Sequence, residues 1–208
     1  MYIFFFFYAI CIALVYSTWM HGWDSTSQAM ATDFSWIKIG TDIDFQFVAT
    51  HYSIVSIEKC SARGSNYTTE DAIYYTAHKL KQINPDIKIL FYYATDSQGW
   101  NCYESTKQFL NHPEWFLKTD KGDIFQPNNP ILDPTIPEAQ EWWASVPFLG
   151  TDGTGLWNNI PVINLIDGVL ADSDGWFNQP PDLFSTQRLE QIVDGRMKMV
   201  GIMQDKFS

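Results

Sequence analysis

The stretch with the clearest potential for chemistry is Ile166–Phe177, which reads I-D-G-V-L-A-D-S-D-G-W-F. Its apolar run over 168–171 is bounded by turn residues, which indicates a short buried strand. Asp172 and Asp174 follow that strand, where carboxylates are costly to desolvate unless they are paired or used. Two neighbouring carboxyl groups can act together in catalysis, one as acid and one as nucleophile or base, so we take Asp172 and Asp174 as candidate catalytic residues. The alternative interpretation is a plain Asp-Ser-Asp-Gly turn.

Other polar and aromatic residues follow the remaining expected strands. At strand ends, an acid can bind sugar hydroxyls, and an indole face can stack on a sugar ring. The candidate substrate-binding residues are Glu58, Tyr93, Asp96, Trp100 and Trp176. Simpler roles stay open, because Glu58 could pair with Lys59 and Asp96 could cap a loop. Asp174 could likewise accept a hydrogen bond from a sugar hydroxyl instead of acting as the acid.

Several other classes of site find no support in the sequence. The four histidines are scattered without the spacing of metal ligands, and Asp172-x-Asp174-Gly lacks the later Glu of a calcium loop. No glycine-rich phosphate loop and no Gly-x-Ser-x-Gly motif occurs. We therefore expect no metal and no cofactor. The net charge of −11 argues against nucleic acid and anionic membrane surfaces as partners.

The elements that must position these residues alternate between strands and helices. The expected strands are 36–39, 53–57, 87–94 and 168–171, and the expected helices are 42–50, 68–84, 135–146 and 185–203. An irregular, aromatic-rich excursion is expected over 109–125. Such alternation implies an α/β fold with a parallel sheet covered by helices. Asp172 would lie at the carboxyl edge of this sheet, and Asp167 at the opposite, structural edge.

Side-chain spacing also predicts which helical residues face the core. They are Phe47, Val48, Ile73, Ala77, Leu80, Ala139, Trp142, Trp143, Val146, Leu189, Ile192, Val193, Met197 and Val200. Thr68 and Asp71 have the spacing of a capping box, as have Thr135 and Glu138. Gly195 is expected to weaken the middle of the last helix.

The chain begins with a continuous apolar run from Tyr2 to Tyr16, followed by the small residue Ser17. The length of this run suits the core of a signal peptide better than a membrane-spanning helix. We therefore expect residues 1–18 to be a signal peptide and residues 19–208 to form one domain of a secreted, extracellular protein. An uncleaved membrane anchor and a buried helix are the alternatives.

In an extracellular protein, two further sequence features predict covalent modifications. Cys60 and Cys102 remain after cleavage as an even pair, so one disulfide is expected, with two buried thiols as the alternative. Asn66 opens an Asn-Tyr-Thr sequon, which predicts N-glycosylation of an exposed loop, although such triplets also arise by chance.

Two segments resemble a motif pair of glycoside hydrolases with a (β/α)8 barrel. They are D-P-T-I-P-E-A-Q-E-W-W over Asp133–Trp143 and D-G-V-L-A-D over Asp167–Asp172. Alpha-glucosidase-like hydrolases carry a similar helix start and a similar strand whose last Asp is the nucleophile. Uncharacterised glycoside-hydrolase-like families share this order and a Lys-x-x-Asn-Pro-x-x-Lys-Ile stretch, here Lys81–Ile89. Departures at Ile136 and at 173–175 favour a relative of the uncharacterised kind.

The resemblance implies a secreted glycoside hydrolase-like protein that acts on a polysaccharide or glycan by carboxylate-based hydrolysis. A complete barrel needs at least about 200 residues and typically about 250. Only three or four strand–helix units are visible here, so we expect a partial (β/α)8 barrel, the amino-terminal half of a longer protein. The general acid would then lie on a later strand, and this part alone would be nearly inactive. A non-catalytic carbohydrate-binding relative and a polysaccharide lyase stay open as alternatives.

Overall fold

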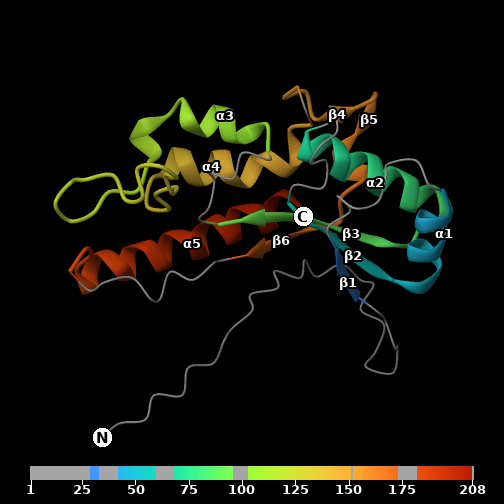
Figure 1. Cartoon of the computed structure of the whole chain (residues 1–208), viewed down its shortest axis with the longest axis horizontal. Helices are drawn as coiled ribbons and strands as arrows, with labels where there is room; N and C mark the ends of the chain where they lie inside the picture. The colour runs from blue at the N-terminus through green and yellow to red at the C-terminus, as the bar shows by residue number, and fades with distance from the viewer. Residues whose placement is uncertain are drawn as a thin grey trace, which may run out of the picture.

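The computed structural model describes residues 29–32, 42–59, 68–95, 103–150, 152–172 and 182–207. Its centre is a sheet in the order β1-β2-β3-β6 (Figure 1). The strands are β1 (Ala29–Thr32), β2 (Ile54–Ile57), β3 (Lys88–Ala94) and β6 (Gly168–Asp172). Every neighbouring pair is parallel, so the expected parallel α/β sheet is confirmed. Within the described ranges the sheet is open and forms no closed barrel.

The helices and the smaller elements follow in chain order. The described α-helices are α1 (Asp42–His51), α2 (Thr69–Ile83), α3 (Ser105–Leu110), α4 (Pro137–Ser145) and α5 (Thr186–Lys206). Short 3-10 helices are η2 (Pro113–Trp115), η3 (Val146–Phe148) and η4 (Val162–Asn164). A separate antiparallel hairpin joins β4 (Leu156–Trp157) to β5 (Ile160–Pro161). Its turn residues Asn158 and Asn159 both have positive φ, as a tight two-residue hairpin turn requires.

α2 begins and ends where its sequence predicts. The side chain of Thr68 accepts a hydrogen bond from the backbone N–H of Asp71 at 3.1 Å, which satisfies an otherwise free amide of the first turn. The residues expected to face inward, Ile73, Ala77 and Leu80, are fully buried. The helix stops at Asn84, directly before Pro85.

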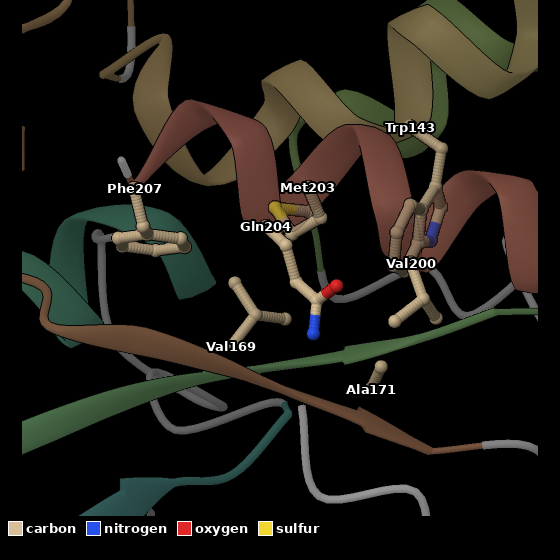
Figure 2. A pocket seen from close by; sticks show the side chains of 7 residues that line it. All are labelled: Trp143, Val169, Ala171, Val200, Met203, Gln204 and Phe207. Atoms are coloured by element: carbon tan, nitrogen blue, oxygen red, sulfur yellow. The ribbon is translucent and has the colours of Figure 1, made fainter. Parts of the chain in front are cut away.

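The two faces of the sheet differ because side chains alternate along each strand. One face, which we call the helix face, carries buried Val55, Ile57, Ile89, Phe91, Tyr93 and Val169. The ring of Tyr74 in α2 packs on Phe91, and Trp143 in α4 stacks on Tyr93 with 5.6 Å between ring centroids. α5 lies over Val169 on the same side (Figure 2).

The second face carries the alternate residues of the same strands. They are Ile54, Ser56, Leu90, Tyr92, Leu170 and Asp172. Its composition is more polar than that of the helix face. Asp172 therefore lies on the side of the sheet opposite to α2, α4 and α5.

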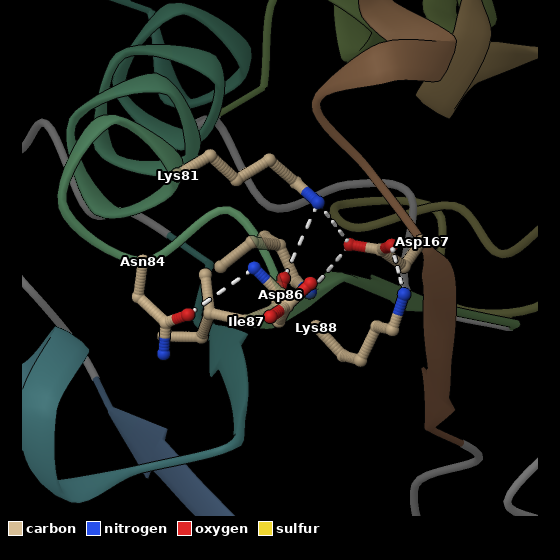
Figure 3. Close-up of polar contacts among 7 residues, drawn as sticks. Lys81, Asn84, Asp86, Ile87, Lys88 and Asp167 are labelled. Atoms are coloured by element: carbon tan, nitrogen blue, oxygen red, sulfur yellow. Dashed lines mark hydrogen bonds and ion pairs between the residues drawn. The ribbon is translucent and has the colours of Figure 1, made fainter. Parts of the chain in front are cut away.

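Asp167 lies at the amino edge of the sheet, as expected (Figure 3). Its carboxylate pairs with Lys81 at 2.7 Å and with Lys88 at 3.2 Å, and it accepts a hydrogen bond from the backbone N–H of Ile89 at 2.9 Å. Lys81 also donates to the carbonyl of Ile87 at 3.2 Å. These contacts join α2, β3 and β6, so the role of Asp167 is structural.

Two expectations about helix starts and faces are corrected. Phe47 is 52% exposed, because α1 turns Phe45, Val48 and Ala49 toward the core with three- and four-residue spacing. Thr135 does not cap α4, since Ile136 is the N-cap residue and makes no side-chain cap. The Thr135 hydroxyl instead donates to Asp133 Oδ1 at 2.6 Å.

The inward face of α5 is also corrected in part. Ile192 is buried as expected, and Val200 is partly exposed. Three other residues expected inside, Leu189, Val193 and Met197, are 37%, 44% and 57% exposed. The core side of α5 is instead made by Ile192, Met199 and Met203, together with Gly195 and Arg196.

The segment between α3 and α4 is more ordered than the expected irregular excursion. Antiparallel bridges join Phe116 to Leu132 and Lys118 to Ile124. A second apolar cluster is formed by Leu117, Phe125, Ile131, Phe184 and Ile192. Asp120 accepts a hydrogen bond from the backbone N–H of Ser185 at 2.6 Å. The segment, drawn in yellow in Figure 1, thus packs beside the start of α5.

Candidate functional site

Asp172 is held at the carboxyl edge of the sheet by its own backbone. It pairs in register with Ala94, the last residue of β3. The carbonyl of Asp172 accepts two hydrogen bonds from Thr95, one from the backbone N–H at 2.7 Å and one from the hydroxyl at 3.1 Å. Two neighbouring strands therefore fix the Cα position from which the carboxylate projects.

The Asp172 carboxylate is held by a tyrosine on the neighbouring strand. The hydroxyl of Tyr92 donates to Asp172 Oδ2 at 2.6 Å, a length typical of a strong hydrogen bond to a charged acceptor. Lys59 Nζ in turn donates to the Tyr92 hydroxyl at 3.0 Å and lies 4.6 Å from the centroid of its ring. The Tyr92 side chain is only 3% exposed. Lys59, two residues after β2, the phenol of Tyr92 in β3 and the carboxylate of Asp172 in β6 thus form a chain.

Tyr92 takes the place that the sequence assigned to Tyr93. Because adjacent strand residues point to opposite faces, only one of the two tyrosines can lie beside Asp172. Tyr93 is on the helix face, 1% exposed, with its ring stacked on Trp143. Its burial leaves no access for a sugar, so the interpretation of Tyr93 as a substrate-binding residue is corrected. Burial also raises the pKa of Tyr93, which keeps its hydroxyl neutral.

Of the remaining candidates, Glu58 alone lies among the described residues. It directly follows β2 at the same edge as Asp172 and is partly buried. Asp96, Trp100, Asp174 and Trp176 lie outside the described residues, as do Cys60, Cys102, Asn66 and residues 1–18. The structure therefore brings Asp172, Tyr92 and Lys59 together and leaves those candidates as sequence predictions.

Two other carboxylates that could be mistaken for catalytic groups are structural. Glu70 is buried and accepts hydrogen bonds from the backbone N–H groups of Glu104 at 2.9 Å and Ser105 at 3.0 Å, so it caps the start of α3. Asp133 pairs with Arg188, which also donates to the Thr135 hydroxyl at 3.0 Å. The segment Asp133–Trp143, which carries part of the resemblance, thus holds α5 against the start of α4 through Asp133 and Thr135.

A small apolar pocket of about 10 Å³ lies between α5 and the helix face (Figure 2). Its lining is Trp143, Val169, Ala171, Val200, Met203, Gln204 and Phe207. The volume is roughly that of one water molecule, and the lining contains no acid or base. The pocket is therefore a packing gap with no hydrolytic chemistry.

Within the described ranges, no group of three or more His, Cys, Asp or Glu side chains is arranged to hold a metal ion. Among the helices that the structure describes, none has the length and apolar character needed to cross a membrane.

In sequence comparisons with known proteins, neither a family model nor a curated protein matches this chain. The interpretation of the site therefore depends on its own geometry.

Tyr92 and Lys59 were not predicted as site residues from the sequence, although one signal for Tyr92 was available. Tyr92 lies two residues before Ala94, so alternation puts it on the face of the residue that ends β3 beside Asp172.

Proposed function

We propose that this protein is a secreted glycoside-hydrolase-like protein that acts on a polysaccharide or glycan, with Asp172 as a catalytic carboxylate. The observation that carries this proposal is the carboxylate of Asp172 at the carboxyl edge of a parallel sheet, held at 2.6 Å by Tyr92. Barrels built from alternating strands and helices bind their substrates at this edge. The signal peptide at 1–18 and glycosylation at Asn66 belong to the same proposal.

The sheet, in this proposal, is part of a (β/α)8-type barrel. Support comes from the strand order β1-β2-β3-β6, which follows the chain without the reversal typical of doubly wound sheets. The contacts of α2, α4 and α5 with one face also suit a barrel, since the other face then points to the interior. That interior face carries Tyr92 and Asp172.

Hydrolysis gives the groups at this edge distinct roles. An oxocarbenium-like transition state develops positive charge at the sugar, and the Asp172 carboxylate stabilises it as nucleophile or as a fixed negative charge. A second carboxyl group must protonate the leaving oxygen or activate water. Glu58, which lies at the same edge, and Asp174 are the candidates within this sequence.

A polysaccharide lyase is the second candidate, and one observation favours it. The hydrogen bond from Lys59 to Tyr92 at 3.0 Å is the arrangement that assists a tyrosine base, which could remove a proton from a uronate. However, the phenol is 3% exposed and already donates its proton to Asp172. Hydrolysis therefore explains the direction of this hydrogen bond better than elimination.

Product analysis on a panel of neutral and uronate-containing polysaccharides separates the candidates. We expect only slow formation of new reducing ends, because this part alone would be nearly inactive, and no ultraviolet absorbance of an unsaturated uronate. Absorbing products would instead establish the lyase. Retention of the protein on an immobilised polysaccharide without any product would favour the non-catalytic binding relative and contradict the proposal.

A further inference from the structure

The two carboxylate oxygens of Asp172 differ in their hydrogen bonding. Oδ2 accepts the 2.6 Å hydrogen bond from Tyr92. Among the residues that the structure describes, Oδ1 has no hydrogen-bond partner. An oxygen that already accepts a short hydrogen bond is less available to a substrate than one with both lone pairs open.

We infer that Lys59 and Tyr92 position Asp172 through Oδ2 and leave Oδ1 as the oxygen that faces the substrate. The identity of the substrate in this inference rests on the proposed function. The hydrogen-bond geometry of the three side chains does not depend on that function. Tyr92 and Lys59 are positioning residues, because the buried phenol contacts Asp172 rather than the sugar.

Two hydrogen bonds make the chain directional. The Lys59 ammonium donates to the phenol oxygen and cannot accept, so the phenol hydrogen must point elsewhere. It points to Asp172, the acceptor within 2.6 Å. Because donation by a cation polarises the phenol, the bond from Tyr92 to Asp172 is strengthened.

The backbone completes the positioning. The two hydrogen bonds from Thr95 to the Asp172 carbonyl fix the main chain, and the Tyr92 bond fixes the far end of the side chain. With both ends held, rotation of the carboxylate that would exchange Oδ1 and Oδ2 breaks a short hydrogen bond. The positioning itself involves no covalent step and no proton transfer.

The neighbouring tyrosine provides a matched control. Tyr92→Phe removes the hydroxyl that reaches Asp172, whereas Tyr93→Phe removes a hydroxyl from the opposite face of the same strand. Carbon-13 labelling at the aspartate carboxyl, with Asp172→Asn to assign its resonance, reports the hydrogen bond directly without any substrate. We expect Tyr92→Phe to shift this resonance and to abolish its response to deuterium exchange, and Tyr93→Phe to leave both unchanged. A smaller shift is expected for Lys59→Met.

The kinetic consequence is a second readout on a hydrolysed substrate. We expect Tyr92→Phe to lower kcat about ten- to a hundredfold with little change in KM, because the hydrogen bond orients the carboxylate rather than the sugar. An unchanged Asp172 resonance in Tyr92→Phe, or an equal shift in Tyr93→Phe, would overturn the inference whatever the activity. An unchanged resonance in Lys59→Met would overturn the part assigned to Lys59. Loss of the proposed function is seen separately, as absence of hydrolysis by the unaltered protein.

Discussion

Gly195 of α5 lies directly against the backbone of Pro134, so closely that a Cβ atom at position 195 would be 2.2 Å from the Pro134 carbonyl oxygen. No side chain fits this contact. Gly195 therefore lets α5 approach the segment that precedes α4, where Arg188 pairs with Asp133. The expected weakness of this helix at Gly195 is thus offset by close packing.

Replacement of Gly195 tests this contact against helix propensity. Alanine normally stabilises a helix interior by about 1 kcal/mol relative to glycine. At position 195 we expect the clash with backbone atoms to outweigh that gain, so Gly195→Ala should lower the free energy of unfolding by about 1–3 kcal/mol. Gly201→Ala in the same helix is the control, because its Cβ would meet nothing within 4 Å, and it should stabilise slightly. Denaturant titration measures both, and equal stabilisation by the two variants would contradict the contact.

The pair of Asp133 and Arg188 should contribute more to stability than an exposed pair. The Asp133 side chain is 8% exposed, so removal of Arg188 leaves a mostly buried carboxylate without its cation. We expect Arg188→Met to lower the free energy of unfolding by about 2–4 kcal/mol, with a measurable coupling energy in the double-mutant cycle with Asp133→Asn.

The exposed pair of Lys107 and Glu104 supplies the comparison. Its side chains are 74% and 43% exposed, and such pairs contribute less than about 1 kcal/mol. Lys107→Met should therefore change stability little. If the two cycles give the same coupling energy, burial is not what distinguishes the Asp133 pair.

Glu70 should make stability depend on pH in a defined direction. Burial raises the pKa of Glu70, and this effect outweighs the lowering by the backbone hydrogen bonds of Ser105 and Glu104. The folded state therefore holds the proton more tightly than the unfolded state. The contribution of Glu70 is fully present below its unfolded pKa of about 4.3, and it is lost as the pH rises through the folded-state value.

Glu70→Gln isolates this effect because glutamine does not titrate. The free energy of unfolding of the wild type minus that of Glu70→Gln should fall as the pH rises above about 4. Unfolding titrations at a series of pH values measure this difference. A difference that stays constant or rises with pH would show that the hydrogen bonds, not burial, dominate at Glu70.

The sequence was sufficient for the parts of the fold that depend on local signals. The strands around Val55, Phe91 and Val169 were predicted from apolar runs, and their parallel arrangement from the alternation of strands with helices. The start of α2 at Thr68 was predicted from its capping residues. The structural role of Asp167 also followed from its place before the strand.

The residues that were misassigned are those whose orientation depends on tertiary contacts. The rotation of α5 is set by Gly195 and Arg188 against the segment before α4, and the apolar spacing of Val193 and Met197 carries no information about that contact. Thr135 has the spacing of a cap, but its hydroxyl donates to Asp133 and accepts a hydrogen bond from Arg188 of α5. In both cases the contact between α5 and the segment before α4 overrides the local pattern.

Of the three residues that form the hydrogen-bonded chain, only Asp172 was predicted from the sequence. Its partners lie on other strands, so strand register and the face of each residue had to be known before Tyr92 could be chosen over Tyr93. Lys59 required in addition the path of the chain after β2. These quantities come from packing between segments that are far apart in the sequence.

The most direct test of Asp172 as a catalytic carboxylate is the hydrolysis of dinitrophenyl glycosides. Their leaving group departs without a proton, so its release depends on the nucleophile or stabilising charge and needs no acid, although hydrolysis of a covalent intermediate would still use the second carboxyl group as base. Asp172→Asn keeps the size of the side chain and removes its charge, whereas Asp167→Asn makes the same change at the opposite end of the strand. Per folded molecule, we expect Asp172→Asn to lose at least about a hundredfold in turnover and Asp167→Asn to keep it. Absence of hydrolysis by the unaltered chain across a panel of sugars, or full turnover by Asp172→Asn, would contradict the assignment.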